Sequence, residues 1–194
     1  MTAGGNLEWV RNLFGNPSYQ DIFDTAFDRP PSNLLYLPYL NGERSPFSDP
    51  LAQAAFVGIN ARTETGDMYR AVLEGVAYAY RHCLEALINN PIESLVLTGG
   101  GTRTESWCQL FADVTGVPVI LPEEGQHSGI RGTLMSARVA QGSLTSYVPT
   151  GSFSPPVRRL EANARLRSMY DRGYAQFRAL YPALKDIFTQ MNTA

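Results

Sequence analysis

The spacing of hydrophobic residues in the N-terminal part of the chain predicts two short helices followed by an extended run. Apolar side chains recur at helical steps in residues 6–14, with Asn6 as the expected N-cap and Gly15 as the expected stop. A second amphipathic segment, 18–27, ends before a pair of prolines, which cannot continue a helix. Residues 34–40 are almost all apolar and include a proline, which is typical of an edge strand or of a strand entering a loop.

A longer amphipathic pattern begins at Asp67 and continues to about Leu87. Its apolar residues repeat every three or four positions, as they do on one face of a helix. We expect Asp67 to begin this helix and to complement its dipole rather than to take part in chemistry. Small residues at Ala71, Gly75 and Ala79 predict that a neighbouring element approaches the helix closely.

The middle of the chain predicts a strand, a helix and a second strand. Residues 94–100 indicate a buried strand, residues 105–115 carry an amphipathic pattern that ends at Gly116, and residues 117–121 indicate a second short strand. Two strands joined by a helix in this way are parallel, and their sheet is covered by helices. The segment therefore predicts an α/β fold.

The C-terminal part of the chain predicts two more helices separated by a linker. A helix is predicted over about 129–140, and the small residues around its start, Ser128, Gly129 and Gly132, indicate close packing. A turn-rich linker, 149–156, precedes a long predicted helix from about 157 to 188, interrupted at Pro182. Aromatic residues of this helix are expected in the core, namely Tyr170, Tyr174, Phe177 and Tyr181. We expect a lobe over residues 1–150 and a helical extension of it over 151–194.

Composition narrows the classes of protein that the chain can represent. Its 194 residues can bury a real core, and a net charge of −2 argues against a general nucleic-acid or acidic-membrane binder. Cys83 and Cys108 lie in apolar helical patterns without metal-ligand spacing, so buried reduced thiols are expected. The sequence shows neither a long apolar span nor a signal-peptide pattern. We expect a cytoplasmic protein.

The glycines 99–101 could form either a nucleotide-binding loop or only a tight turn. A glycine-rich turn between a strand and a helix exposes backbone N–H groups that bind phosphate, but it can equally be only a sharp turn. The absence of lysine from residues 99–106 excludes a P-loop. A dinucleotide-binding fingerprint would need a third glycine where Thr104 stands, although Glu123 and Glu124 follow roughly where a ribose-binding acid would be. The residues alone leave the turn and the nucleotide loop open.

Several other polar residues are candidates for a site. Glu43 and Arg44 form a charged pair in a turn-rich loop, and the pair could face a cleft or form a surface ion pair of small energetic value. An ion pair within the long helix is the expected role of Glu74, and structural hydrogen bonding is that of Asp113. The histidines have no partner pattern, so solvated or structural roles are expected for His82 and His127.

Over nearly its whole length, the chain resembles the C-terminal part of the FGGY carbohydrate kinases. Residues 54–74, AAFVGINARTETGDMYRAVLE, fit the family's C-terminal signature at every restricted position. The stretch 42–59, GERSPFSDPLAQAAFVGI, is similar to the xylulokinase-like members. The triple glycine, the polar residues 102–107 and the C-terminal LYPALKD also resemble family features.

The resemblance implies an actin-like ATPase (ribonuclease H-like) fold. Its C-terminal lobe has a mixed sheet with flanking helices and a long C-terminal helix. ATP and Mg²⁺ would bind between two lobes, and the sugar would bind largely to the N-terminal lobe. The positions carried over for ATP are Gly99, Gly100, Gly101 and Thr102, with Arg103 and Glu105 as weaker candidates. Arg103 and Glu105 are weaker because the family varies there and this chain lacks the asparagine that glycerol kinases place after the loop. No catalytic or metal-ligating residue is carried over.

The resemblance also implies that essential parts lie outside this chain. In the family, the catalytic aspartate and both phosphate loops precede the matched region, so we expect a fragment that binds ATP weakly and is inactive alone. A noncatalytic pseudokinase or binding module that associates with another chain is an alternative. A homodimer is a further alternative, and so is a dinucleotide-binding enzyme dependent on Glu123 or Glu124, which Thr104 in place of the third glycine counts against. The residues that choose the sugar, with a pentulose such as xylulose favoured, would lie mostly in the other lobe.

Overall fold

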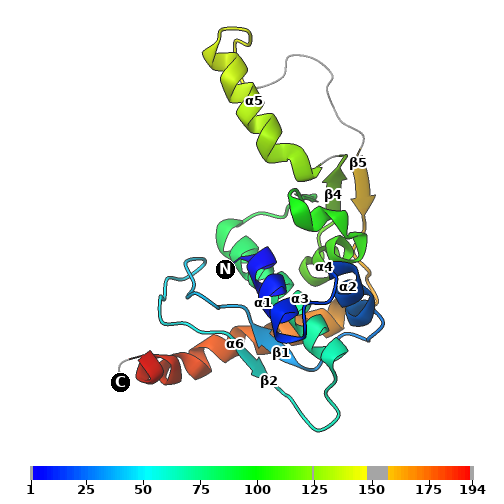
Figure 1. The fold of residues 1–194 in the computed structure, drawn as a ribbon, viewed down its shortest axis with the longest axis vertical. Helices are drawn as coiled ribbons and strands as arrows, with labels where there is room; N and C mark the ends of the chain where they lie inside the picture. Colours follow the sequence, from blue (N-terminus) through cyan, green and yellow to red (C-terminus); the bar gives the residue numbers. More distant parts are fainter. Residues whose placement is uncertain (1, 124, 148–156, 193–194) are drawn as a thin grey trace.

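The protein is described by a computed structural model that covers residues 2–123, 125–147 and 157–192. Figure 1 shows how the elements are arranged along the chain. The elements, with 3₁₀ helices written as η, are α1 (Ala3–Leu13), α2 (Tyr19–Phe27), β1 (Leu35–Leu37), β2 (Ala55–Val57), α3 (Thr65–Leu87), β3 (Leu95–Val96), η1 (Gly100–Arg103), α4 (Glu105–Thr115), β4 (Val119–Pro122), η2 (Gly125–His127), α5 (Ser128–Ala140), β5 (Val157–Leu160) and α6 (Arg167–Asn192).

Helix α3 is the central element, and α1, α2, α4, α6 and β1 all pack against it. It begins two residues before the predicted start, because Glu64 and Asp67 form a capping box in which the Asp67 carboxylate accepts the Glu64 N–H at 2.8 Å. A Cβ on Gly75 would lie only 2.3 Å from the carbonyl oxygen of Tyr36 in β1. The predicted close approach to this helix is therefore confirmed.

A buried ion pair on α3 links three parts of the core. The Nε of Arg70 donates to the Glu74 carboxylate at 2.7 Å, and an Nη of Arg70 donates to the hydroxyl of Tyr170 in α6 at 2.8 Å. The same carboxylate accepts the backbone N–H of Ser32 at 3.2 Å. Burial raises the pKa of Glu74, and the ion pair opposes that effect. The predicted ion pair of Glu74 is confirmed, and its role is structural.

The strands form two small sheets. Strands β1 and β2 pair antiparallel, and β3, β4 and β5 form a mixed sheet in that order. Leu95 pairs with Val119 in the parallel β3–β4 ladder, which confirms the predicted strand, helix and strand unit. Strand β2 was not predicted, because its three residues are too few to show a strand period within the segment 51–59.

Strand β5 corrects the prediction that residues from 157 onward are helical. It pairs antiparallel with β4, from Val119 opposite Leu160 to Pro122 opposite Val157. The four residues, VRRL, do not alternate apolar and polar side chains, so their sequence carries no strand period that would distinguish them from a helix. Pairing with β4, a long-range contact, decides their conformation.

Helix α1 corrects the expected position of a helix start. It begins at Ala3, so Asn6 lies inside the helix rather than at its N-cap. The Asn6 amide donates to the carbonyls of Thr2 at 2.9 Å and Pro38 at 3.2 Å, and its oxygen accepts the hydroxyl of Tyr36 at 2.7 Å. Asn6 thus fixes α1 to the segment after β1, since every polar atom of this buried amide has a partner.

Helix α4 occupies the predicted residues, and Gly116 ends it with a left-handed φ of 71°. Its last carbonyls are satisfied by side chains of two other helices. Arg81 of α3 donates to the Val114 oxygen at 3.0 Å, and Arg167 of α6 donates to the Thr115 oxygen at 2.9 Å. Cations at a helix C-terminus also complement its dipole, so these contacts fix α4 between α3 and α6.

Helix α6 is continuous through Pro182, which corrects the predicted interruption. Its aromatic residues Tyr170, Tyr174 and Phe177 are buried as predicted, while Tyr181 is half-buried. The predicted linker 149–156 and the predicted boundary at 150 lie outside the described residues. Among the helices of the described ranges, none combines the length and apolar character that a membrane span requires.

Helix α5 corrects the prediction of close packing around its first residues. None of its thirteen residues, all of which the structure describes, is buried. Apart from the chain neighbours and the backbone of α5 itself, no heavy atom of the described chain lies within 4 Å of a Cβ built on Gly129 or Gly132. In Figure 1, α5 extends away from the body formed by the other helices.

Candidate functional site

The candidate site is built around the glycine loop, residues 98–104, which joins β3 to α4. The backbone N–H of Gly99 donates to the carbonyl of Gly125 in η2 at 3.1 Å. The carbonyl of Gly99 in turn accepts the backbone N–H of Thr102 at 3.1 Å and its hydroxyl at 2.7 Å. The loop is therefore a hydrogen-bonded turn held against η2.

The three glycines of the loop have different reasons to be glycine. Gly99 has a φ of +98°, where a side chain would be strained. A Cβ on Gly101 would lie 3.3 Å from the ring of Trp107, closer than most such contacts. Gly100 has neither feature: it is not among the glycines with positive φ, and apart from its chain neighbours nothing in the described chain lies within 4 Å of a built Cβ. The turn explains Gly99 and Gly101, and Gly100 borders open space.

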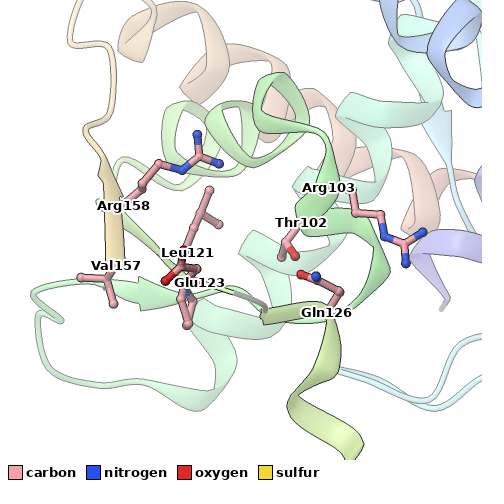
Figure 2. A pocket seen from close by; sticks show the side chains of 8 residues that line it. Thr102, Arg103, Leu121, Glu123, Gln126, Val157 and Arg158 are labelled. Atoms are coloured by element: carbon pink, nitrogen blue, oxygen red, sulfur yellow. The ribbon is translucent and has the colours of Figure 1, made fainter. Parts of the chain in front are cut away.

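An outer cavity of about 430 Å³ lies on one side of the loop. Its volume falls within the range of small-molecule sites. It is lined by Thr102, Arg103, Leu121, Pro122, Glu123, Gln126, Val157 and Arg158. Figure 2 shows Thr102 and Gln126 close together in the view, and Arg103 extending away from the side where Arg158 lies. The loop, the end of β4 and the start of β5 therefore enclose one polar space.

The charges around the outer cavity are partly compensated. Arg158 forms a close ion pair with Glu105, the first residue of α4. Both side chains are exposed, so the pair contributes little stability, but it occupies the Glu105 carboxylate. Arg103 is exposed on the loop, and Glu123 is exposed at the opposite wall. Arg103 is the cation of the loop that is available to an anionic ligand.

An inner cavity of about 180 Å³ lies beneath the loop and is mostly apolar. It is lined by Ala3, Gly4, Tyr80, Leu97, Thr98, Gly101, Thr102, Trp107, Cys108 and Phe111. The thiol of Cys108 donates to the Gly101 carbonyl at 3.9 Å, and burial raises the pKa of this thiol to about 11. Cys108 therefore stays protonated and supports the loop. Because Thr102 lines both cavities, it marks the boundary between them.

The structure adds two residues that the sequence did not indicate. Ala3 and Gly4, at the N-terminus of α1, line the inner cavity opposite the glycine loop. They come from a helix start far from the loop in sequence, so no local spacing joins them. The pair Gly4 and Gly5, just before an amphipathic run, is the signal that could have suggested a close approach.

Glu43 and Arg44 are not part of this site. They line a separate cavity of about 440 Å³ together with Thr2 and Asn6. The buried Glu43 carboxylate accepts the backbone N–H groups of Arg44 at 2.7 Å and Ser45 at 3.2 Å. Glu43 thus shapes its own turn, and the exposed Arg44 side chain lies at the cavity wall.

The other candidates, Asp113 and His82, contact other parts of the fold and line neither cavity beside the loop. The Asp113 carboxylate accepts the amide of Gln109 and the backbone N–H of Asn163, both at 2.8 Å, as expected. Burial, with a smaller effect of Arg178, lowers the pKa of His82, which packs beside Phe47. Among the residues that the structure describes, no group of three or more His, Cys, Asp or Glu side chains is arranged to hold a metal.

Comparison with known proteins identifies what the loop and its surroundings resemble. Residues 2–141 match the model of the C-terminal domain of the FGGY family of carbohydrate kinases. A xylulose kinase from Staphylococcus epidermidis is 27% identical over 200 residues, which cover 100% of this chain and 40% of that protein. The chain thus spans less than half the length of the curated relatives that it matches.

Solved structures agree with this match. The xylulose kinase of Lactobacillus acidophilus superposes with a TM-score of 0.85 at 29% identity, over 97% of this chain and 39% of that one. The gluconate kinase of the same species superposes with a TM-score of 0.83 at 28% identity, with the same coverage. These neighbours confirm the predicted actin-like α/β lobe with its mixed sheet and long C-terminal helix. The chain therefore belongs to the FGGY family of carbohydrate kinases, whose C-terminal domain its residues 2–141 match.

Proposed function

We propose that this chain is the nucleotide-binding lobe of a carbohydrate kinase that transfers the γ-phosphate of ATP to a hydroxyl of a sugar or polyol. The observation that carries the proposal is the glycine turn between β3 and α4, which borders both cavities through Gly101 and Thr102 and leaves open space beside Gly100. A glycine without a steric reason inside the folded chain suits a position where a ligand approaches the backbone.

The surroundings of the loop fit a nucleotide. The aromatic wall of the inner cavity suits an adenine base, and Ala3 and Gly4 leave room for it from the α1 side. The backbone of Gly99, Gly100 and Gly101 lies at the start of a strand-to-helix connection, where N–H groups favour phosphate. In this proposal Thr102 lies beside the nucleotide, between the two cavities.

Arg103 and Glu105 have different parts in the proposal. The exposed guanidinium of Arg103 is available to a phosphate. Glu105 is held by Arg158, so it positions the start of α4 and binds no ligand directly. Mg²⁺ would bind together with ATP and would neutralise charge on the phosphates. Because Mg²⁺ commonly takes only one or two carboxylates from the protein, the lack of an acidic cluster among the described residues is compatible with its binding.

Phosphoryl transfer also needs a base that accepts the proton of the sugar hydroxyl. Among the described residues that line the two cavities, the only carboxylate is that of Glu123, which is exposed on the wall of the outer cavity. We infer that this chain binds and orients the nucleotide, and that it is inactive until another lobe supplies the base. Its location is proposed to be the cytoplasm, where ATP is available.

The acceptor proposed is a pentulose such as xylulose. Xylulose kinases stand among both the sequence relatives and the structural neighbours. The gluconate kinase, at 28% identity, is nearly as similar as the xylulose kinase at 29%. The preference for a pentulose therefore rests on the GERSP-containing stretch of residues 42–59 rather than on overall identity.

Calorimetric titration of the 194-residue chain with MgATP tests the proposal. We expect binding, and we expect Gly100→Ala to raise Kd by roughly tenfold, or about 1.4 kcal/mol, because its methyl group would enter the ligand's space. Gly129→Ala, on α5 away from both cavities, is the matched control and should leave Kd unchanged. A folded chain that takes up no nucleotide, or an equal Kd for Gly100→Ala, would overturn the proposal.

A further inference from the structure

The loop between β1 and β2 holds Arg44 at the wall of a third cavity, which the proposed function does not use. This cavity has a volume of about 440 Å³, and its lining includes residues 40–45 of the loop and, at the start of α1, Thr2 and Asn6. Its volume is ordinary for a small-molecule site. Of the described residues that line it, only Glu43 and Arg44 are charged, and only Arg44 is exposed. We call it the Arg44 cavity.

Hydrogen bonds within the loop fix the backbone on both sides of Arg44. The backbone groups of Glu43 and Asp49 pair in both directions, and each N–H donates to the other carbonyl at 2.9 Å. The Glu43 carboxylate, which is 3% exposed, accepts the backbone N–H groups of Arg44 at 2.7 Å and of Ser45 at 3.2 Å. The turn that carries Arg44 is therefore closed by its own polar groups.

Two helices hold the same loop from outside. The Cys83 thiol of α3 donates to the Ser45 carbonyl at 3.3 Å. The Tyr181 hydroxyl of α6 donates to the Asp49 carboxylate at 2.5 Å, and the Tyr181 ring stacks on Phe47 with the ring centroids 4.1 Å apart. A loop supported in this way presents its side chains to a ligand without a large entropic cost of ordering the backbone.

The guanidinium of Arg44, by contrast, lacks a partner within the described chain. Its side chain has no hydrogen bond or ion pair to any residue that the structure describes. Buried arginines elsewhere in the fold are paired, as Arg70 is with Glu74. A guanidinium presents five N–H donors in a planar fork that matches the oxygens of a phosphate or a carboxylate. A fixed loop with such a cation at a cavity wall therefore suits an anion from outside the chain.

The Arg44 cavity adjoins the proposed nucleotide site. Thr2 and Asn6 line it, whereas Ala3 and Gly4 line the inner cavity beneath the glycine loop. These residues belong to the first turn of α1 and the position before it, so the two cavities lie beside the same turn. A phosphate chain that passes this turn would lead from a base in the inner cavity to Arg44.

We propose that the Arg44 cavity binds a phosphate group through the guanidinium of Arg44. Two sources carry this chemistry in the proposed reaction, namely the terminal phosphates of ATP and the phosphate of the sugar product. The neighbouring nucleotide site favours the terminal phosphates. Arg44 is a binding residue in this proposal and takes part in no bond-making step. The proposal rests on the proposed function and adds a phosphate contact beyond residues 99–101 and Arg103.

Calorimetric titration of the 194-residue chain with MgATP, adenosine and inorganic phosphate tests this contact. Arg44→Gln should raise the Kd for MgATP by roughly tenfold, because charge-assisted hydrogen bonds to a phosphate are lost. The Kd for adenosine, which carries no phosphate, should not change. Arg44→Lys keeps the charge but not the planar fork, so its Kd for MgATP should lie between those of the wild type and Arg44→Gln.

Arg172→Gln is the matched control, since it removes an exposed arginine of α6 that lines none of the three cavities. It should leave the Kd for MgATP unchanged. Because Arg44 and Arg172 are both exposed, Arg44→Gln and Arg172→Gln should keep the melting temperature of the wild type. Inorganic phosphate stands in for the phosphate of the sugar product. If Arg44→Gln raised only the Kd for inorganic phosphate, the cavity would be assigned to that second source.

Unchanged Kd values for both MgATP and inorganic phosphate in Arg44→Gln would overturn the proposal. An equal loss of adenosine binding would do the same, since Arg44 would then act through the fold, and so would an equal loss in Arg172→Gln, since only net charge would then matter. Failure of the proposed function gives a different result. A chain that binds inorganic phosphate through Arg44 but takes up neither MgATP nor adenosine would contradict the nucleotide site and keep the Arg44 cavity.

Discussion

Gly99 has φ +98° and ψ −177°, a backbone region that only glycine adopts without strain. We expect Gly99→Ala to lower the free energy of unfolding by about 1 to 3 kcal/mol. Gly100→Ala has an unhindered Cβ and should lower it by much less. Urea denaturation of the two variants measures the difference. Equal losses for both would mean that the loop is not held in this conformation.

Gly75 is constrained by contact rather than by its backbone angles. The Cβ of Gly75→Ala would lie 2.3 Å from the Tyr36 carbonyl oxygen, and α3 is packed against α1, α2, α4 and α6 as well as β1. Overpacking of this kind costs about 1 to 3 kcal/mol. Gly129→Ala, in an exposed helix with open space, should instead be neutral or stabilise by up to about 1 kcal/mol. Thermal unfolding followed by circular dichroism compares the two, and a stable Gly75→Ala would contradict the packing described.

The two sets of small residues show what the sequence can predict at the residue scale. Ala71, Gly75 and Ala79 indicated close approach, and β1 supplies it within the chain. Gly129 and Gly132 gave the same indication, yet nothing in the described chain packs against them. Small residues indicate that a helix face can be approached, but they do not encode which surface approaches it.

At the scale of elements, the C-terminus of α4 is a junction of three helices. Asp171 of α6 lies between the two arginines that bind the α4 carbonyls, with an oxygen 2.7 Å from Arg81 Nη1 and another 2.9 Å from Arg167 Nε. Partial burial opposes ionisation of Asp171, but the hydrogen bonds and charges of Arg81 and Arg167 outweigh it and lower the pKa of this carboxyl.

This junction predicts a pH dependence. A lowered pKa in the folded state means that the stabilisation is complete above the ordinary aspartate pKa of about 3.9 and is lost as the pH falls through the lowered value. Asp171→Asn should therefore reduce stability at neutral pH and flatten its fall in acid. Urea midpoints between neutral and acidic pH measure both effects, with Glu161→Gln as a control at an exposed carboxylate. If Asp171→Asn lowered the urea midpoint by the same amount at all pH values, ionisation of Asp171 would not be the source of the pH dependence.

The elements differ in how far local sequence determines them. Helix α4 was predicted to the residue, because an acidic first turn and Gly116 mark both ends. Strand β5 was predicted as helix, since its conformation depends on pairing with β4 about forty residues away in sequence. The glycine loop could be identified from its local sequence, whereas Ala3 and Gly4 join the site only through the packing of α1.

At the scale of the whole molecule, the last part of the chain carries core residues although the family match ends at residue 141. Tyr170 and Phe177 are each 1% exposed. A Cβ on Gly173 would lie 2.3 Å from the Tyr78 hydroxyl, so α6 and α3 are in close contact. Strand β5 completes the sheet beside β4. The body formed by residues 2–141 therefore depends on a segment outside the matched domain.

This dependence gives a prediction for truncation. A chain ending at Leu144 would expose the apolar surfaces of α3 and α4 that α6 covers and would remove the Arg167 contact with α4. Burial of large side chains contributes about 1.5 to 3 kcal/mol each, and natural domains are stable by only about 5 to 15 kcal/mol. Loss of Tyr170, Tyr174 and Phe177 should thus abolish cooperative unfolding in a calorimetric scan. A chain ending at Gln190, which keeps all three residues, is the control and should unfold as the wild type does. A cooperative transition in the shorter chain would show that α6 is an appendage, and that residues 2–141 fold as a unit without it.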